Sequence, residues 1–165
     1  MECGYTSFFF LCENFMDRNK IALCGGCFDC LHIAHIELLK SARDYASHVV
    51  VGINSDDYIR KTKGGCRPIF NEEERAEMLI ALEYVDDVIV FREDNIANLI
   101  LRIKPDYYIK GADWNGEKKL PQEEIDACNK VSCSLIYITH KYTDRITTTY
   151  INDSVQGDTK DGIQD

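Results

Sequence analysis

Segments typical of buried strands alternate with helical patterns along most of this chain. The expected strands cover residues 20–24, 48–53, 85–91, 107–110 and 135–139, and the helical patterns cover 31–46, 71–82, 96–103 and 122–130. Strands separated by helices pair in parallel, because the chain has to cross back over the sheet before it enters the next strand. The alternation therefore predicts an α/β fold, a Rossmann-like, doubly wound, parallel five-stranded sheet with helices on both faces.

The helix expected at 71–82 also has a local start signal. Asn71 precedes it, and Glu74 follows three residues later. An Asn side chain can accept from the first free N–H groups of a helix, while a glutamate in the first turn reaches back to the backbone of the cap. The pair predicts a capping box.

The length of 165 residues fits one domain with its own hydrophobic core. The periodic pattern occupies residues 16–152, which we assign to that domain. Residues 1–15 are expected to form an N-terminal extension. Residues 153–165 carry four Asp and one Lys among small polar residues, a composition that predicts an acidic, disordered tail.

Composition and charge exclude several classes of protein. No apolar run approaches the roughly 20 residues of a membrane span. The apolar segment 5–12 is short and is preceded by Glu2 instead of a basic stretch, unlike a signal peptide. We therefore expect a cytoplasmic protein with no membrane partner. The net charge of -9 is opposite in sign to that of most nucleic-acid binders, so no nucleic-acid partner is expected either.

Three of the eight cysteines, Cys24, Cys27 and Cys30, crowd the junction between the first strand and the first helix. Their spacing resembles half of a metal site. No second pair of Cys or Cys/His ligands follows at the spacing of a zinc finger. The sequence therefore predicts free thiols and no structural metal.

The same junction carries the densest chemical signal, in which Gly25-Gly26 is followed by His32 and His35. Glycines after a strand let the backbone approach a phosphate, and a helix N-terminus offers free N–H groups and a positive dipole end. Histidines three apart share one face of the first helical turn. The alternative is a pair of structural histidines, but their place beside an anion-binding turn favours phosphoryl chemistry.

Ligands of doubly wound sheets bind at the carboxyl ends of the strands. Here those ends are predicted at residues 25–29, 54–57, 111–114 and 140–149. The sequence motifs fall on these four segments, and this agreement favours an enzyme.

The run Cys27-Phe28-Asp29, with His32 and His35, resembles the signature of the cytidylyltransferase-like nucleotidyltransferases. The resemblance extends over about residues 20–152 and includes Gly52-Ile53-Asn54-Ser55-Asp56, Arg67-Pro68, Glu74-Arg75, Tyr84-Val85-Asp86, Lys104-Pro105-Asp106, Lys110-Gly111-Ala112-Asp113 and Thr147-Thr148-Thr149. The order of these motifs is most similar to that in the adenylyltransferase half of the bifunctional heptose-phosphate kinase/adenylyltransferases.

This resemblance implies an enzyme that transfers a nucleoside monophosphate from ATP to a sugar phosphate of the heptose-1-phosphate type and releases pyrophosphate. The run Asp113-Trp114-Asn115-Gly116 is similar to a motif of glycerol-3-phosphate cytidylyltransferases, so CTP with glycerol 3-phosphate or another phospho-alcohol is the alternative. Ala34 and Arg145 replace family glycines, which leaves a catalytically degenerate nucleotide-binding module as a third reading. Retention of both histidines and of all three threonine hydroxyls argues against that module.

The resemblance also assigns roles to single residues. The catalytic residues are His32, His35 and Lys63, with the histidines at the α-phosphate and Mg²⁺ carried on the triphosphate instead of by protein ligands. The expected nucleotide-binding residues are Cys27, Phe28, Lys61, Arg75, Gly111, Asp113, Thr147, Thr148 and Thr149. Asp29 and Trp114 are expected at the acceptor. The implied assembly is a homodimer whose substrates are a nucleoside triphosphate and a phosphorylated small molecule.

Some of these residues also have a simpler interpretation. Lys61 and Lys63, expected on the loop after the second strand, are solvated surface charges when taken alone. Arg75 follows three glutamates, so it also fits an ion-pair partner. Trp114, the only tryptophan, also fits a packing residue.

Overall fold

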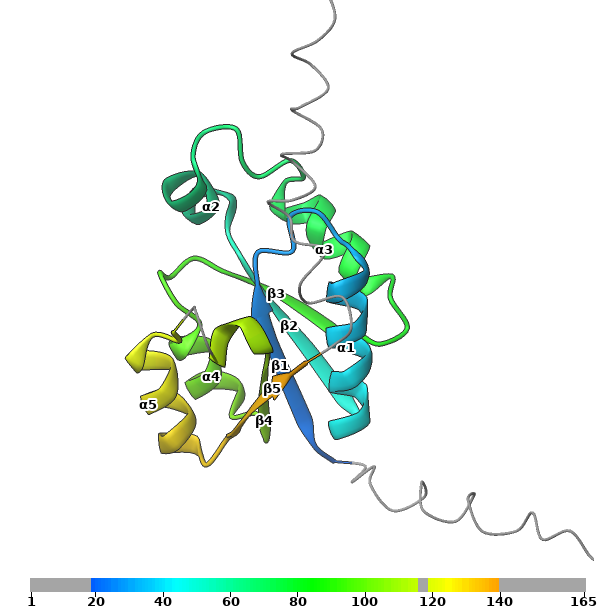
Figure 1. Cartoon of the computed structure of the whole chain (residues 1–165), viewed down its shortest axis with the longest axis vertical. Helices are drawn as coiled ribbons and strands as arrows, with labels where there is room; N and C mark the ends of the chain where they lie inside the picture. Colours follow the sequence, from blue (N-terminus) through cyan, green and yellow to red (C-terminus); the bar gives the residue numbers. More distant parts are fainter. Residues whose placement is uncertain (1–18, 116–118, 140–165) are drawn as a thin grey trace, which may run out of the picture.

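A computed structural model describes residues 19–115 and 119–139 of the chain. All five strands of the sheet are parallel, in the order β3-β2-β1-β4-β5 (Figure 1). The strands are β1 (Ile21–Gly26), β2 (His48–Asn54), β3 (Asp87–Phe91), β4 (Tyr107–Gly111) and β5 (Ser134–Ile138). The helices are α1 (Ile33–Tyr45), α2 (Asp56–Lys63), α3 (Glu72–Ile80), α4 (Ala97–Ile103) and α5 (Gln122–Val131), with a 3-10 turn, η1 (Ala112–Asn115). The predicted fold class is confirmed.

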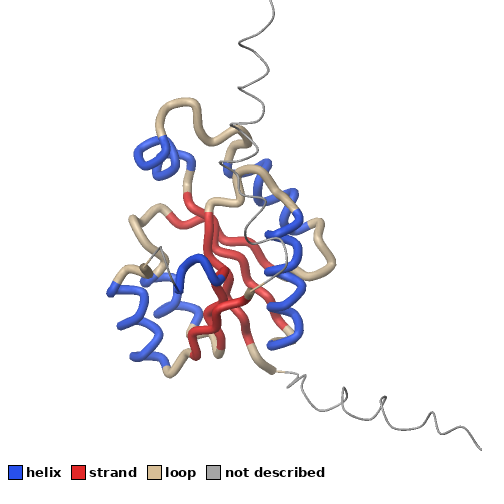
Figure 2. The backbone as a smooth tube through the Cα atoms, in the orientation of Figure 1, coloured by secondary structure: helices blue, strands red, loops and turns tan. Residues whose placement is uncertain are grey.

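Alternate residues of each strand face opposite sides of the sheet, as the pleat requires. Ala22 and Cys24 of β1 belong to a core shared with α1 and α3, whereas Leu23 between them packs with α4 and α5. In the same way Val51 faces the first core and Val50 the second. Figure 2 shows the strands between these two layers of helices. Burial on both faces explains why the strands are almost wholly apolar.

The predicted elements agree with the structure apart from their ends and two omissions. The third strand begins at Asp87 rather than at Val85, because the Val85 N–H donates to Leu82 O at 3.1 Å and so belongs to a turn. The helix α2 and the turn η1 were not predicted. In α2 only Ile59 is buried, so the apolar periodicity that reveals a helix is missing there.

The sheet opens between β1 and β4 at its carboxyl end. Pairing of β1 with β2 continues to Gly26 and Ile53, but pairing of β1 with β4 stops at Cys24 and Ile109. The strand order also reverses between β1 and β4, because β2 and β3 lie on one side of β1 and β4 and β5 on the other. Ligands of such sheets bind at a switch point of this kind.

Within the described ranges no helix is long and apolar enough to cross a membrane. The predicted extension at 1–15, the end of the domain at 140–152 and the acidic tail at 153–165 lie outside the described residues.

Candidate active site

The structure brings the two motif histidines into contact at the start of α1. His32 is the residue that caps the helix, with φ -140 and ψ 170, and His35 lies one turn further on. The His35 N–H donates to His32 O at 2.9 Å. Their imidazole rings stack, with centroids 3.7 Å apart and planes 21° from parallel. His32 therefore lies just before the helix instead of within it, but the spacing of three still pairs the rings.

The turn between β1 and α1 fixes this pair. Phe28 adopts φ 48 and its buried side chain packs against His35, with ring centroids 4.8 Å apart. The Phe28 ring also lies over Gly26, where an added Cβ would come within 3.1 Å of it. The first turn of α1 contains no acidic residue. The positive end of α1 is thus combined with two imidazoles, an arrangement suited to a phosphate.

Asp29 holds a loop in the structure. Its carboxylate is almost fully buried and forms an ion pair with Arg67. The backbone N–H groups of Ile69 and Phe70 donate to its other oxygen at 2.7 and 3.3 Å. Both oxygens of Asp29 therefore accept hydrogen bonds. These bonds hold the segment before α3 beside the turn between β1 and α1.

Arg75 is completely buried, and its guanidinium is surrounded by acceptors. It donates to the carbonyl oxygens of Phe70, Cys27 and Asn54 and to the carboxylate of Asp56, the last at 2.8 Å. These contacts tie the turn after β1 and the end of β2 to α3. They match the ion-pair interpretation of this residue, and a direct contact with nucleotide stays a prediction.

Lys61 and Lys63 belong to the last turns of α2, not to a loop. Both side chains are exposed, and Lys61 forms an ion pair with Asp94 at 3.0 Å. In Figure 1 α2 lies beyond the carboxyl end of the sheet, apart from the start of α1. The structure therefore does not bring these two lysines together with the histidine pair.

The residues after β4 fold tightly at the other side of the opening. The Asp113 side chain folds back over Gly111, and an added Cβ there would lie 2.7 Å from Asp113 Oδ1, so Asp113 would have to move. Trp114 in η1 packs, partly buried, against the core on the α4 and α5 side. Thr147, Thr148 and Thr149 lie outside the described residues.

Lys110 is a candidate site residue that the sequence analysis missed. It is 6% exposed at the end of β4, and its Nζ donates to Gly25 O at 3.0 Å. The position of a lysine in a short apolar strand could have indicated a functional residue, because buried strands rarely contain a charged side chain.

The thiols near the site are free. Cys24, Cys27 and Cys30 form no disulfide, and the Cys27 thiol donates to Asn54 Oδ1 at 3.4 Å. Burial raises the pKa of the Cys24 thiol to about 12, so that thiol stays protonated near neutral pH. Within residues 19–115 and 119–139, no three His, Cys, Asp or Glu side chains are grouped to hold a metal.

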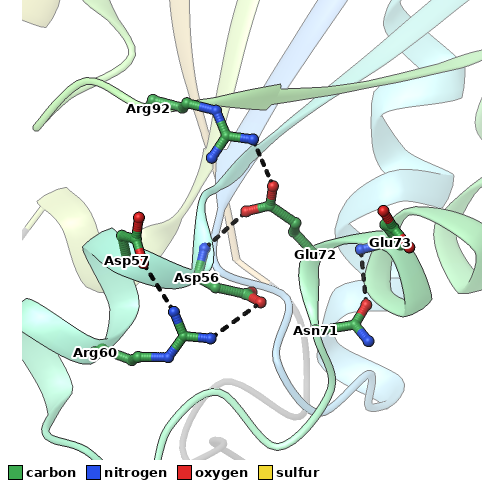
Figure 3. Close-up of a pocket in the computed structure, with 7 residues that line it drawn as sticks. All are labelled: Asp56, Asp57, Arg60, Asn71, Glu72, Glu73 and Arg92. Carbon is green, nitrogen blue, oxygen red and sulfur yellow. Dashed lines mark hydrogen bonds and ion pairs between the residues drawn. The ribbon is translucent and has the colours of Figure 1, made fainter.

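A pocket of about 390 Å³ lies elsewhere, between α2 and α3 (Figure 3). It is lined by Asp56, Asp57, Arg60, Asn71, Glu72, Glu73 and Arg92. Its charges are largely paired internally: Arg60 bonds to Asp57 at 2.8 Å and Arg92 to Glu72 at 2.7 Å. The remaining acidic groups disfavour a phosphate in this pocket.

Comparison with known proteins agrees with this geometry. The sequence model of the family described as "Cytidylyltransferase-like" matches residues 23–153. Bifunctional protein HldE of Campylobacter fetus subsp. fetus is 46% identical over 101 residues, which cover 61% of this chain and 22% of that protein. Bifunctional protein HldE of Bradyrhizobium diazoefficiens is 43% identical over 112 residues, covering 68% of this chain and 23% of that protein. The chain thus spans less than a quarter of the length of these relatives.

Solved structures show the same fold. A lipopolysaccharide core biosynthesis protein from Thermoplasma volcanium has a TM-score of 0.60 and 26% identity, over 73% of this chain and 94% of that one. A pantothenate synthetase from Thermus thermophilus has a TM-score of 0.52 over 84% of this chain and 66% of that one, and at 12% identity it supports the fold alone. The family match, the sheet order and the stacked histidines agree, and the chain belongs to the cytidylyltransferase-like family of nucleotidyltransferases.

Proposed function

We propose that this domain transfers AMP from ATP to a sugar phosphate of the heptose-1-phosphate type and releases pyrophosphate. The observation that carries the proposal is the stacked His32 and His35 pair at the positive end of α1, next to the opening between β1 and β4. The order of the sequence motifs favours the adenylyltransferases of heptose phosphates. The identity of 43–46% to HldE proteins over this segment supports the same choice.

The proposed reaction needs no side-chain nucleophile. An oxygen of the acceptor phosphate attacks the α-phosphorus, a new P–O bond forms, and the bond to the leaving pyrophosphate breaks. The protein has to align the two substrates and offset the negative charge that spreads over the phosphates. We assign this task at the α-phosphate to His32, His35 and the N–H groups at the start of α1. Mg²⁺, carried on the triphosphate, supplies further neutralisation of charge.

The other assignments made from sequence are part of the proposal. For the nucleotide we propose contacts from Cys27, Phe28, Lys61, Arg75, Gly111, Asp113, Thr147, Thr148 and Thr149, with Lys63 closing on the phosphates. We propose that Trp114 contacts the acceptor. We propose that Asp29 contributes to acceptor binding by holding the loop before α3 in place. We also propose a cytoplasmic homodimer.

The test is pyrophosphate release by the wild-type protein with MgATP or MgCTP, against sugar 1-phosphates and glycerol 3-phosphate. We expect ATP to be preferred by roughly tenfold to a thousandfold, the effect of one or two unmatched hydrogen bonds at the base. His35→Ala should lower kcat by about 100-fold or more while the protein stays folded, because charge stabilisation at the α-phosphate is lost.

The matched control is His48→Ala. His48 is half-exposed at the amino end of β2, where it contacts Asp87 at 2.7 Å, far from the carboxyl end of the sheet. Its removal should leave turnover unchanged. Faster release from CTP and glycerol 3-phosphate would favour the cytidylyltransferase alternative. Binding of ATP without turnover on any acceptor would favour a degenerate module.

A further inference from the structure

Lys110 lies where β1 and β4 stop pairing. The pairing of these strands ends at Cys24 and Ile109, so Gly25 and Lys110 are the first residues beyond it. The Lys110 Nζ spans this gap and donates to Gly25 O at 3.0 Å. Gly25 begins the glycine turn that leads to the histidine pair. A buried cation thus lies where the topology places a ligand.

The charge of Lys110 is poorly compensated by the described part of the protein. An ammonium group has three N–H donors, and among the described residues only Gly25 O accepts one. The aromatic rings of Trp114 and Tyr108 lie 4.3 and 5.5 Å from Nζ and contribute weaker attraction. The nearby buried carboxylate of Glu124 is occupied, because it accepts from the Tyr108 hydroxyl at 2.8 Å and from the Ile96 N–H.

Burial of this charge has a cost in free energy. Desolvation lowers the pKa of the Lys110 ammonium below its ordinary value of 10.5, while Glu124 acts in the opposite direction. Buried charges in proteins are normally paired or used. Within residues 19–115 and 119–139 Lys110 forms no ion pair with a carboxylate, and Glu124 and Asp113 favour its charged form without direct contact.

We propose that Lys110 binds a phosphate group of one of the two substrates in the opening between β1 and β4. Its side chain lies on the α4 and α5 side of the sheet, next to Trp114 and Tyr108, whereas Phe28 and His35 lie on the α1 side. Lys110 and the start of α1 therefore approach the same end of the sheet from opposite faces. This inference rests on the proposed function, because that function supplies the phosphorylated substrates that Lys110 would bind.

The test compares Lys110→Met with Lys130→Met, which removes the same charge from an exposed position on α5. Binding of MgATP, inorganic pyrophosphate and mannose 1-phosphate is measured by calorimetry, and Tm by thermal unfolding. Loss of a charge-assisted hydrogen bond should weaken at least one ligand about 10- to 100-fold in Lys110→Met and none in Lys130→Met. The Tm of Lys110→Met should stay the same or rise, because a buried charge is removed.

The pattern of losses identifies the phosphate. Weaker ATP and pyrophosphate binding assigns Lys110 to the triphosphate, and weaker mannose 1-phosphate binding alone assigns it to the acceptor. Unchanged affinities for all three ligands, with or without a lower Tm, would overturn the inference and make Lys110 a structural residue. Should Lys110→Met fail to fold, Lys110→Gln keeps a donor for Gly25 without the charge and gives the same comparison.

The proposed function is tested separately. If the wild-type protein releases no pyrophosphate with any acceptor, the proposed transfer fails. Binding of pyrophosphate or mannose 1-phosphate that depends on Lys110 would still stand in that case.

Discussion

Single buried polar residues hold the candidate site in shape. Arg75 of α3 joins two segments that are far from it and from each other in sequence, the turn at Cys27 and the junction of β2 with α2 at Asn54 and Asp56. Asp29 does the same for the loop that precedes α3. Through these contacts both side chains help to position the turn between β1 and α1.

Arg75→Met should therefore destabilise the protein strongly. Removing one partner leaves the Asp56 carboxylate and three carbonyl oxygens without their donor, a loss of about 3–5 kcal/mol in the free energy of unfolding. Arg60→Met is a matched control, since Arg60 also contacts Asp56, at 3.5 Å, but is about half exposed. Its effect should be below about 1 kcal/mol. Urea titration of both variants measures the difference, and equal effects would contradict the role given to Arg75.

At the scale of the element, the helices at the carboxyl end of the sheet depend on their caps. The predicted capping box of α3 is confirmed: Asn71 Oδ1 accepts from the N–H groups of Glu73 and Glu74, and the Glu74 carboxylate accepts from the Asn71 N–H at 2.8 Å. Ser55 caps α2 with a longer bond of 3.4 Å. The cap of α3 matters more for the site, because α3 carries Arg75.

Asn71→Ala should lower the free energy of unfolding by about 1 kcal/mol, since two first-turn N–H groups lose their acceptor. Asn71→Ser keeps an acceptor oxygen and should restore most of the loss. Glu77→Ala, an exposed change in the middle of α3, should alter stability by less than about 0.5 kcal/mol. A thermal or urea series of the three variants measures these effects. A loss in Asn71→Ser as large as in Asn71→Ala would show that the cap is not the cause.

At the scale of the whole molecule, the described residues form two cores, one on each face of the sheet, and titratable groups are buried in both. Cys24 belongs to the core against α1 and α3, and Tyr108 to the core against α4 and α5. Burial raises the pKa of both groups, to about 12 for Cys24. A raised pKa in the folded state means that stability is complete below the ordinary pKa and is lost as the pH rises towards the folded value.

We therefore expect the free energy of unfolding to fall above about pH 9 because of Cys24 and above about pH 10 because of Tyr108, by up to about 1.4 kcal/mol per pH unit for each group. In Cys24→Ala this decline should be shallower, because one of the groups is gone. Cys66→Ala removes an exposed thiol and should leave the slope unchanged. Urea unfolding at a series of alkaline pH values measures the slopes. The same slope in Cys24→Ala as in the wild type would contradict the assignment.

The sequence by itself determined the fold class, the five strands and the histidine pair. These depend on local patterns: alternation of apolar runs with helical periodicity, the cap at Asn71, and a spacing of three between His32 and His35. Such patterns act over a few residues, so they can be read without the fold. The helix α2 was missed because it lacks such a local apolar pattern. It is held by the Ser55 cap, by Arg60 pairing with Asp56 and Asp57, and by little apolar burial.

Only the tertiary structure decided what the charged residues of the motifs contact. The sequence leaves Arg75 open between a nucleotide contact and an ion pair and assigns Asp29 to the acceptor by resemblance, and the fold adds the protein partners of both side chains. The sequence shows Lys110 only as part of a strand. In the structure β1 and β4 stop pairing just before Lys110, and its ammonium group lies beside Gly25 O. The physical reason is that burial and hydrogen-bond partners are set by segments tens of residues apart, which meet only when the sheet is assembled.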